Sequence, residues 1–138
     1  MRRRTLIMTQ SKKDTIHTQL YDIYDEIKAQ LTELNQEKAL VINGPDTKLI
    51  KRGIEISYLQ GQKQATDHIF KLIEQHPDES EFLSSYEAFE QTVKAHFDNN
   101  KKLFSNMSEP NEDFEQVLSK YYHAAGQQFV FEQMNKTN

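Results

Sequence analysis

Each of the three prolines in this chain is followed directly by Asp or Asn, and this pattern strongly constrains how the chain can fold. The three pairs lie at nearly even intervals along the sequence: Pro45-Asp46, Pro77-Asp78 and Pro110-Asn111. Proline cannot continue a helix and biases the residue before it away from helical geometry, whereas Asp and Asn are strong helix N-caps. Each pair therefore predicts that one helix ends and the next begins. The chain is predicted to form four long helical segments.

The composition favours one small helical domain. A length of 138 residues falls within the usual range for a single domain, and 36% hydrophobic with 28% charged residues suits helices that each bury one face. No apolar run approaches the roughly 18 residues of a membrane span. The chain has no Cys, which excludes disulfides, thiolate catalysis and zinc sites ligated by Cys. We expect a cytoplasmic protein with a single bundle domain over residues 11–138.

Charge is distributed unevenly along the chain. All 21 acidic residues lie at position 14 or later, while five of the 17 basic residues precede them: Arg2, Arg3, Arg4, Lys12 and Lys13. Affinity for phosphate requires basic residues over an extended surface, so the acidic body is a poor binder of nucleic acid. Residues 1–10 are expected to form a flexible basic arm, the one part suited to nucleic acid. Met8 is as good a start as Met1, and we favour a frayed or untranslated leader over a functional arm.

Apolar residues recur at steps of three and four in the first segment, which predicts an amphipathic helix from Ser11 to about Val41. Its apolar stripe consists of Ile16, Leu20, Ile23, Ile27, Leu31 and Leu34. The opposite side is acidic. Asn43-Gly44 supplies the stop signal, because Gly readily adopts the backbone geometry that ends helices.

The second helix is predicted to run from Asp46 or Thr47 to about Gln75, with apolar residues on more than one side. Such a helix is usually central or packed against two neighbours. It contains Gly53 and Gly61, and glycine is unfavourable inside a helix. For Gly61 we weigh two interpretations equally: a kink or interruption of the helix, or close packing against another helix.

The last two segments carry most of the aromatic residues. The third helix is predicted to begin at Asp78, with Glu81 in the capping-box position. Its stripe consists of Phe82, Tyr86, Phe89, Val93, Phe97, Phe104 and Met107. The fourth helix follows Asn111. Three short connections between four long amphipathic helices predict an all-α fold, an antiparallel up-down-up-down four-helix bundle, with a bent pair of helical hairpins as the alternative.

Candidate metal ligands are few. A di-iron site of the ferritin kind needs two Glu-x-x-His pairs, and the sequence contains none. Asp14 and His17 come nearest, but one pair cannot satisfy a metal that takes four ligands or more, so we expect no metal or cofactor. His96 and His123 mark the alternative, a small-ligand or metal site between the helices.

Two further surfaces are candidates for binding. Lys48, Lys51 and Arg52 lie near the start of the second helix, where free amides can bind an anion; we favour a solvated basic turn instead. At the C-terminal end, a group of small and apolar residues occupies more than one side of the last helix: Ala125, Phe129, Val130 and Phe131. One bundle core covers only one arc of a helix, so part of this group is a candidate interaction surface. The alternative, which we favour slightly, is that these residues are buried within the bundle against the first or second helix.

The sequence shows no phosphate loop or nucleophile elbow that would indicate an enzyme. We therefore expect a non-enzymatic protein that acts through contact with a protein partner, in a regulatory or adaptor role. Self-association through the last helix is one form of this hypothesis. A small-ligand or metal-binding bundle is the alternative.

Overall fold

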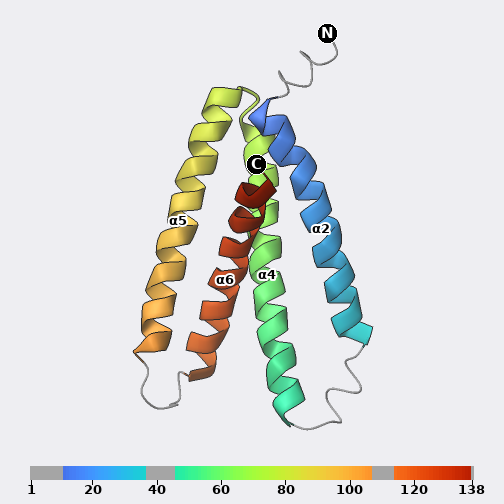
Figure 1. Cartoon of the computed structure of the whole chain (residues 1–138), viewed down its shortest axis with the longest axis vertical. Helices are drawn as coiled ribbons and strands as arrows, with labels where there is room; N and C mark the ends of the chain where they lie inside the picture. The colour runs from blue at the N-terminus through green and yellow to red at the C-terminus, as the bar shows by residue number, and fades with distance from the viewer. Residues whose placement is uncertain (1–10, 37–45, 107–113, 138) are drawn as a thin grey trace.

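The computed structural model describes residues 11–36, 46–106 and 114–137, with the side chains of residues 46–49, 114–115 and 137 excepted. Over these ranges the chain is helical, with no strand. The helices are α2 (Lys12–Gln36), α4 (Asp46–Gln75), α5 (Glu79–Ser105) and α6 (Phe114–Thr137). Successive helices run in opposite directions (Figure 1). The predicted all-α, up-down-up-down bundle is confirmed. The predicted helix end at Val41, the Asn43-Gly44 stop, Met107 and the Pro110-Asn111 break lie outside the described residues.

The helix starts follow the capping chemistry of the sequence. At α2, the Ser11 hydroxyl accepts a hydrogen bond of 3.0 Å from the Asp14 amide. At α5, the Asp78 carboxylate accepts one of 3.0 Å from the Glu81 amide, as the sequence predicted. A side-chain acceptor at this position satisfies one of the amides that a helix start leaves without an intrahelical partner.

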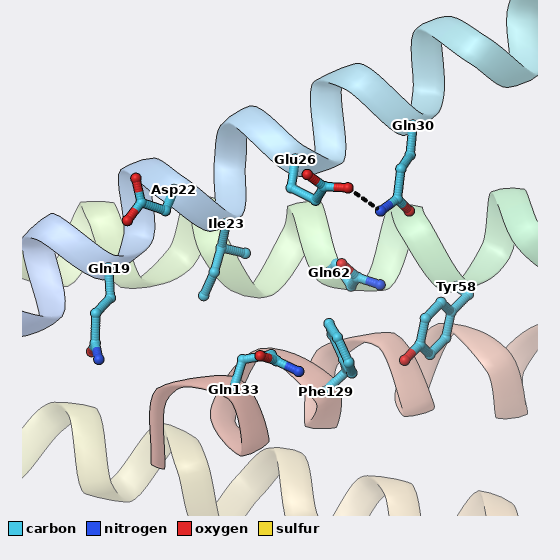
Figure 2. A pocket seen from close by; sticks show the side chains of 9 residues that line it. All are labelled: Gln19, Asp22, Ile23, Glu26, Gln30, Tyr58, Gln62, Phe129 and Gln133. Atoms are coloured by element: carbon cyan, nitrogen blue, oxygen red, sulfur yellow. Dashed lines mark hydrogen bonds between the residues drawn. The ribbon is translucent and has the colours of Figure 1, made fainter. Parts of the chain in front are cut away.

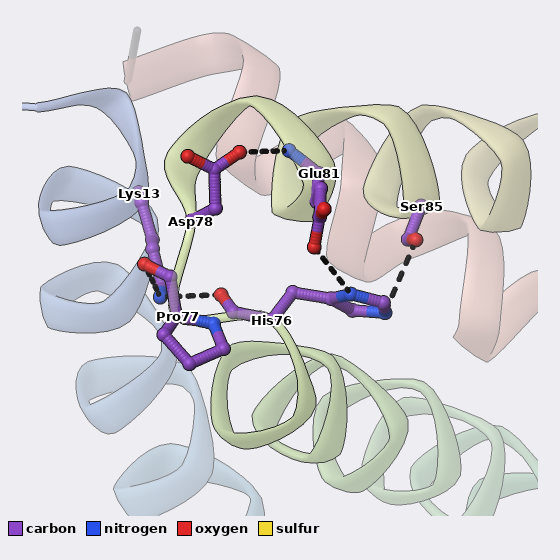
Figure 3. A network of polar contacts seen from close by, with 6 residues as sticks. All are labelled: Lys13, His76, Pro77, Asp78, Glu81 and Ser85. Atoms are coloured by element: carbon purple, nitrogen blue, oxygen red, sulfur yellow. Dashed lines mark hydrogen bonds and ion pairs between the residues drawn. The ribbon is translucent and has the colours of Figure 1, made fainter.

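A lysine ties α2 to the turn between α4 and α5 (Figure 3). The Lys13 ammonium donates hydrogen bonds to the carbonyl oxygens of His76, at 2.7 Å, and Pro77, at 3.2 Å. These carbonyls follow the last turn of α4, where the helix leaves carbonyl groups unsatisfied and where its dipole favours a cation. Lys13, one of the five basic residues that precede every acidic residue in the sequence, therefore belongs to the fold.

The helices are not packed equally. α4 and α6 form the central pair, α2 lies beside α4, and α5 lies beside α6, whereas α2 scarcely contacts α6 or α5. The two central helices run in the same direction (Figure 1). The core gathers buried side chains from all four helices: Ile16, Leu20, Ala65, Ile69, Leu72, Phe82, Tyr86, Val93, Val130, Phe131 and Met134. One hydroxyl in it, that of Tyr86, donates to the Met134 sulfur at 3.2 Å.

Two glycines set the distance between α4 and α6. A Cβ atom at Gly61 would overlap the carbonyl oxygen of His123, and one at Gly126 would overlap the carbonyl oxygen of Tyr58. Both glycines have ordinary negative φ angles, so close approach of the two backbones explains their presence. α4 continues through Gly61 without interruption, and close packing is the interpretation that the structure supports.

Candidate binding groove between α2, α4 and α6

An open groove lies where α2 and α6 diverge over α4 (Figure 2). Its volume is about 670 Å³. Three helices contribute its lining: Gln19, Asp22, Ile23, Glu26 and Gln30 from α2, Tyr58 and Gln62 from α4, and Phe129 and Gln133 from α6. The groove exists because α2 packs on α4 but scarcely contacts α6, so the side of α2 that faces α6 stays uncovered.

The centre of the groove is apolar. Ile23 projects from α2 toward α6, and Phe129 projects from α6 toward it (Figure 2). The rings of Phe129 and Tyr58 are 5.7 Å apart between centroids and inclined at 55°. All three side chains are half-buried. They offer apolar surface that a ligand can cover.

Polar groups surround this centre. Gln62 is only 5% exposed and projects into the groove from α4 (Figure 2). The Gln30 amide donates a hydrogen bond of 2.8 Å to the Glu26 carboxylate. Burial, and then the nearby Glu132 carboxylate, raise the pKa of Tyr58 above its ordinary value of 10.0, so its hydroxyl stays neutral at physiological pH.

The groove continues into a second hollow of about 390 Å³ toward the end of α2. The two share Glu26, Gln30 and Tyr58, and the second adds Glu33, Leu34, Glu55 and Leu59. Four carboxylates therefore line the combined surface: Asp22, Glu26, Glu33 and Glu55. No Lys or Arg is among the residues that line either hollow. We call the combined surface the acidic groove.

The residues expected to form a C-terminal interaction surface differ in their exposure. Val130 and Phe131 are 0% exposed and belong to the hydrophobic core, so neither is available to a partner of the folded chain. The reason is that α6 lies between α4 and α5 and is covered on two sides. Ala125 and Phe129 are half-buried, and of the four only Phe129 lines the groove.

The two described residues of the candidate anion contact, Lys51 and Arg52, both interact with groups of the chain itself. The Lys51 ammonium is exposed and lies 3.9 Å from the Glu55 carboxylate. The Arg52 guanidinium donates to the Leu34 carbonyl oxygen at 3.4 Å, which links α4 to the end of α2. The side chain of Lys48 lies outside the described residues.

The metal candidates are likewise separated from other ligands. Within the described part of the chain, no three His, Asp or Glu side chains are placed to hold a metal ion. The His17 ring packs beside those of Tyr21 and Phe70, at 5.1 and 5.9 Å between centroids, and Asp14 is exposed.

His96 of α5 and His123 of α6 lie close enough for their charges to interact. Burial, and then the proximity of His96, lower the pKa of His123 below its ordinary value of 6.5. His96 itself is exposed, and its carbonyl oxygen accepts a hydrogen bond of 2.8 Å from the buried Asn100 amide. Sequence reasoning identified both histidines but not their proximity, because nothing local predicts which faces of α5 and α6 meet.

A serine, a histidine and a glutamate line up at the α4–α5 turn (Figure 3). The Ser85 hydroxyl lies 3.2 Å from Nε2 of His76, and Nδ1 of His76 lies 3.9 Å from the Glu81 carboxylate. Ser85 is inside α5, where the backbone amides bond within the helix and cannot stabilise an oxyanion. We interpret this arrangement as a tie between the end of α4 and the first turns of α5.

Comparison with protein-family models, with curated proteins and with solved structures finds no match to this chain. Among the described helices, none is long and apolar enough to cross a membrane. The candidate site therefore depends on the geometry and chemistry of the groove itself.

Proposed function

We propose that this chain is a non-enzymatic binding protein whose acidic groove receives a helical segment of a protein partner. One observation carries this proposal. An apolar centre with a polar rim lies open between α2 and α6, on a face where a further helix would complete the packing of both. Recognition of an amphipathic helix by an apolar groove is a recurrent mode of protein–protein interaction.

The dimensions of the groove support a helical occupant. Its α2 side extends from Gln19 to Leu34, which at 1.5 Å per residue is about 22 Å of helix. The lining residues of α2 recur at steps of one, three and four, so they form one continuous face. An incoming helix of about four turns would match that length.

The lining supports binding rather than catalysis. Its polar groups are carboxylates, carboxamides and one phenol, and it includes no His, Ser, Lys or Arg. The Ser–His and Cys–His pairs that serve as nucleophile and base in many enzymes are therefore not among the lining side chains. We accordingly assign the groove a recognition role.

A second candidate is a small apolar ligand in the same groove. The volume of about 670 Å³ favours it, because small-molecule sites usually measure about 300–1,000 Å³. Phe129 and Tyr58 would then pack against the ligand and Gln62 would orient it. A small molecule that remains bound to the purified protein would distinguish this second candidate from the helical partner.

A site-specific crosslink tests the first candidate. A photo-reactive benzoylphenylalanine replaces Gln30 in the groove, and in a matched control it replaces Glu87, which is exposed on α5. In native cells we expect a discrete protein adduct from position 30 alone, and we expect Phe129→Ala to reduce its yield. The crosslinked peptide, identified and synthesised, should bind the purified chain.

Equal labelling from both positions, or no adduct from position 30, would overturn the proposal. Native mass spectrometry of gently purified protein runs in parallel. A retained small molecule, lost in Phe129→Ala and accompanied by no protein adduct, would establish the second candidate in place of the first.

A further inference from the structure

We infer that the partner segment is a basic amphipathic helix, with one apolar face and a stripe of Lys or Arg beside it. This inference rests on the proposed function and specifies the chemistry of the partner. It is derived from the charges of the groove, their spacing along α2, and the position of the apolar centre.

The charges that line the acidic groove have one sign. All ionised side chains that line the acidic groove are carboxylates. Glu55 has a weak partner in Lys51, at 3.9 Å. Asp22, Glu26 and Glu33 form no ion pair with any other residue of the part of the chain that the structure describes. A cleft lined by one sign of charge attracts the opposite sign and disfavours an acidic partner.

The carboxylates that α2 contributes to the groove form a row along the helix. Asp22, Glu26 and Glu33 lie four and seven residues apart on α2, and so share one side of that helix. These steps correspond to about 6 and 10 Å along the axis. A partner helix that lies along α2 can meet all three with basic residues spaced at four and seven along its own sequence.

The apolar centre of the groove lies beside this row. Ile23 and Phe129 lie between α2 and α6, next to the carboxylates rather than among them (Figure 2). A highly charged, non-amphipathic cation would leave these side chains uncovered. A helix with apolar and basic residues on adjacent faces covers them, and the Tyr58 and Phe129 rings can also pack against the stem of an Arg or Lys.

Model peptides test this inference. Three peptides of about five helical turns are compared: an amphipathic Leu/Lys helix, the same design with Glu in place of Lys, and a Leu/Lys peptide of scrambled order. Binding to the full chain is followed by fluorescence anisotropy at low and high salt. We expect the amphipathic Leu/Lys helix to bind most tightly, more weakly at high salt, and the Leu/Glu helix to bind least.

Matched charge variants locate the interaction. Removal of the row by Asp22→Asn, Glu26→Gln and Glu33→Gln together should raise the Kd of the Leu/Lys helix roughly tenfold, since each rim charge contributes modestly. The control removes three exposed carboxylates elsewhere, by Glu74→Gln, Glu87→Gln and Asp98→Asn. It should change the Kd by less than about twofold. Circular dichroism establishes that both variants remain helical.

The outcomes separate the inference from the proposed function. If the Leu/Glu or the scrambled peptide binds as tightly as the amphipathic Leu/Lys helix, the basic amphipathic partner is wrong. Equal losses in the two triple variants would overturn it as well. In either case a protein adduct at position 30 would still support the proposed function. Absence of that adduct would remove the proposed function and, with it, this inference.

Discussion

α6 faces α4 and α2 in opposite ways. Against α4, glycines bring the backbones together: Gly61 lies against His123, and Gly126 lies against Tyr58. Against α2, α6 makes few contacts, and the space between them is the acidic groove. The first contact leaves no room for a side chain and serves stability, whereas the second leaves apolar surface uncovered and is suited to recognition. One helix therefore supplies both roles from different faces.

The difference is visible in two phenylalanines that are two residues apart. Phe131 is 0% exposed and packs among Tyr86 and Phe89 of α5, with ring centroids 5.3 and 5.5 Å away. Phe129 is half-buried and packs on Tyr58 in the groove. Residues two apart on a helix point in nearly opposite directions, so α6 presents one ring to the core and the other to the groove.

The largest expected effect concerns these two rings. Phe131→Ala should lower the free energy of unfolding by about 3–5 kcal/mol, because a fully buried ring leaves a cavity. Phe129→Ala should cost about 1 kcal/mol, since part of that ring is already exposed to water. Urea denaturation followed by circular dichroism measures both. Similar losses from the two variants would contradict the division of α6 into a core face and a groove face.

A smaller effect is expected at the glycines. Gly61→Ala should cost about 2–3 kcal/mol, because the new methyl group would overlap the His123 carbonyl and force α4 and α6 apart. Gly53→Ala is the matched control on the same helix. Apart from the local backbone of α4 itself, no atom lies within 4 Å of a Cβ there, so Ala should stabilise the protein by about 0.5–1 kcal/mol. Thermal melts compare them, and loss of stability in both variants would argue against a close α4–α6 contact.

Local features of the fold were predictable from the sequence. The break at Pro77-Asp78 is confirmed, and the Asp78 carboxylate caps α5 as predicted. The stripe of α2 is also confirmed in large part, with Ile16, Leu20, Ile27 and Leu34 buried. These features depend on residues within a few positions of one another, which is why chain order is enough to predict them.

Pairing of the helices was not predictable in the same way. Apolar residues on several sides of the second helix indicated a central position, and the same reasoning applies to α6, whose Val130 and Phe131 are covered from different sides. The sequence did not indicate that α4 and α6 pair most closely, because the evidence lies in two glycines that are 65 positions apart in the chain. The groove follows from that pairing. Its local signals are two Gln residues of α2, Gln19 and Gln30, and the acidic residues of the same helix.

The smallest expected effect is a dependence of the free energy of unfolding on pH. It comes from the packed side of the bundle, where α6 meets α4 and α5. Burial is the main cause that lowers the pKa of both His68 and His123, with Lys71 and His96 as the respective second causes. The unfolded chain therefore binds more protons than the folded chain just below pH 6.5, the ordinary value for histidine, and the free energy of unfolding should fall as the pH drops through this range. Stability above pH 6.5 should be unaffected by these two groups.

His123→Gln tests the assignment, because a neutral side chain removes one of the two groups that resist protonation. Its free energy of unfolding, measured in urea from pH 7.5 down to 4.5, should vary less steeply with pH than that of the wild type. Phe129→Ala is the control from the other side of α6: it keeps both histidines and should retain the wild-type slope. The assignment is wrong if the free energy of unfolding of His123→Gln varies with pH as steeply as that of the wild type. It is also wrong if the slope for Phe129→Ala is reduced. Because partial exposure weakens the effect of burial on a charged group, the change in slope should be the smallest of the three effects.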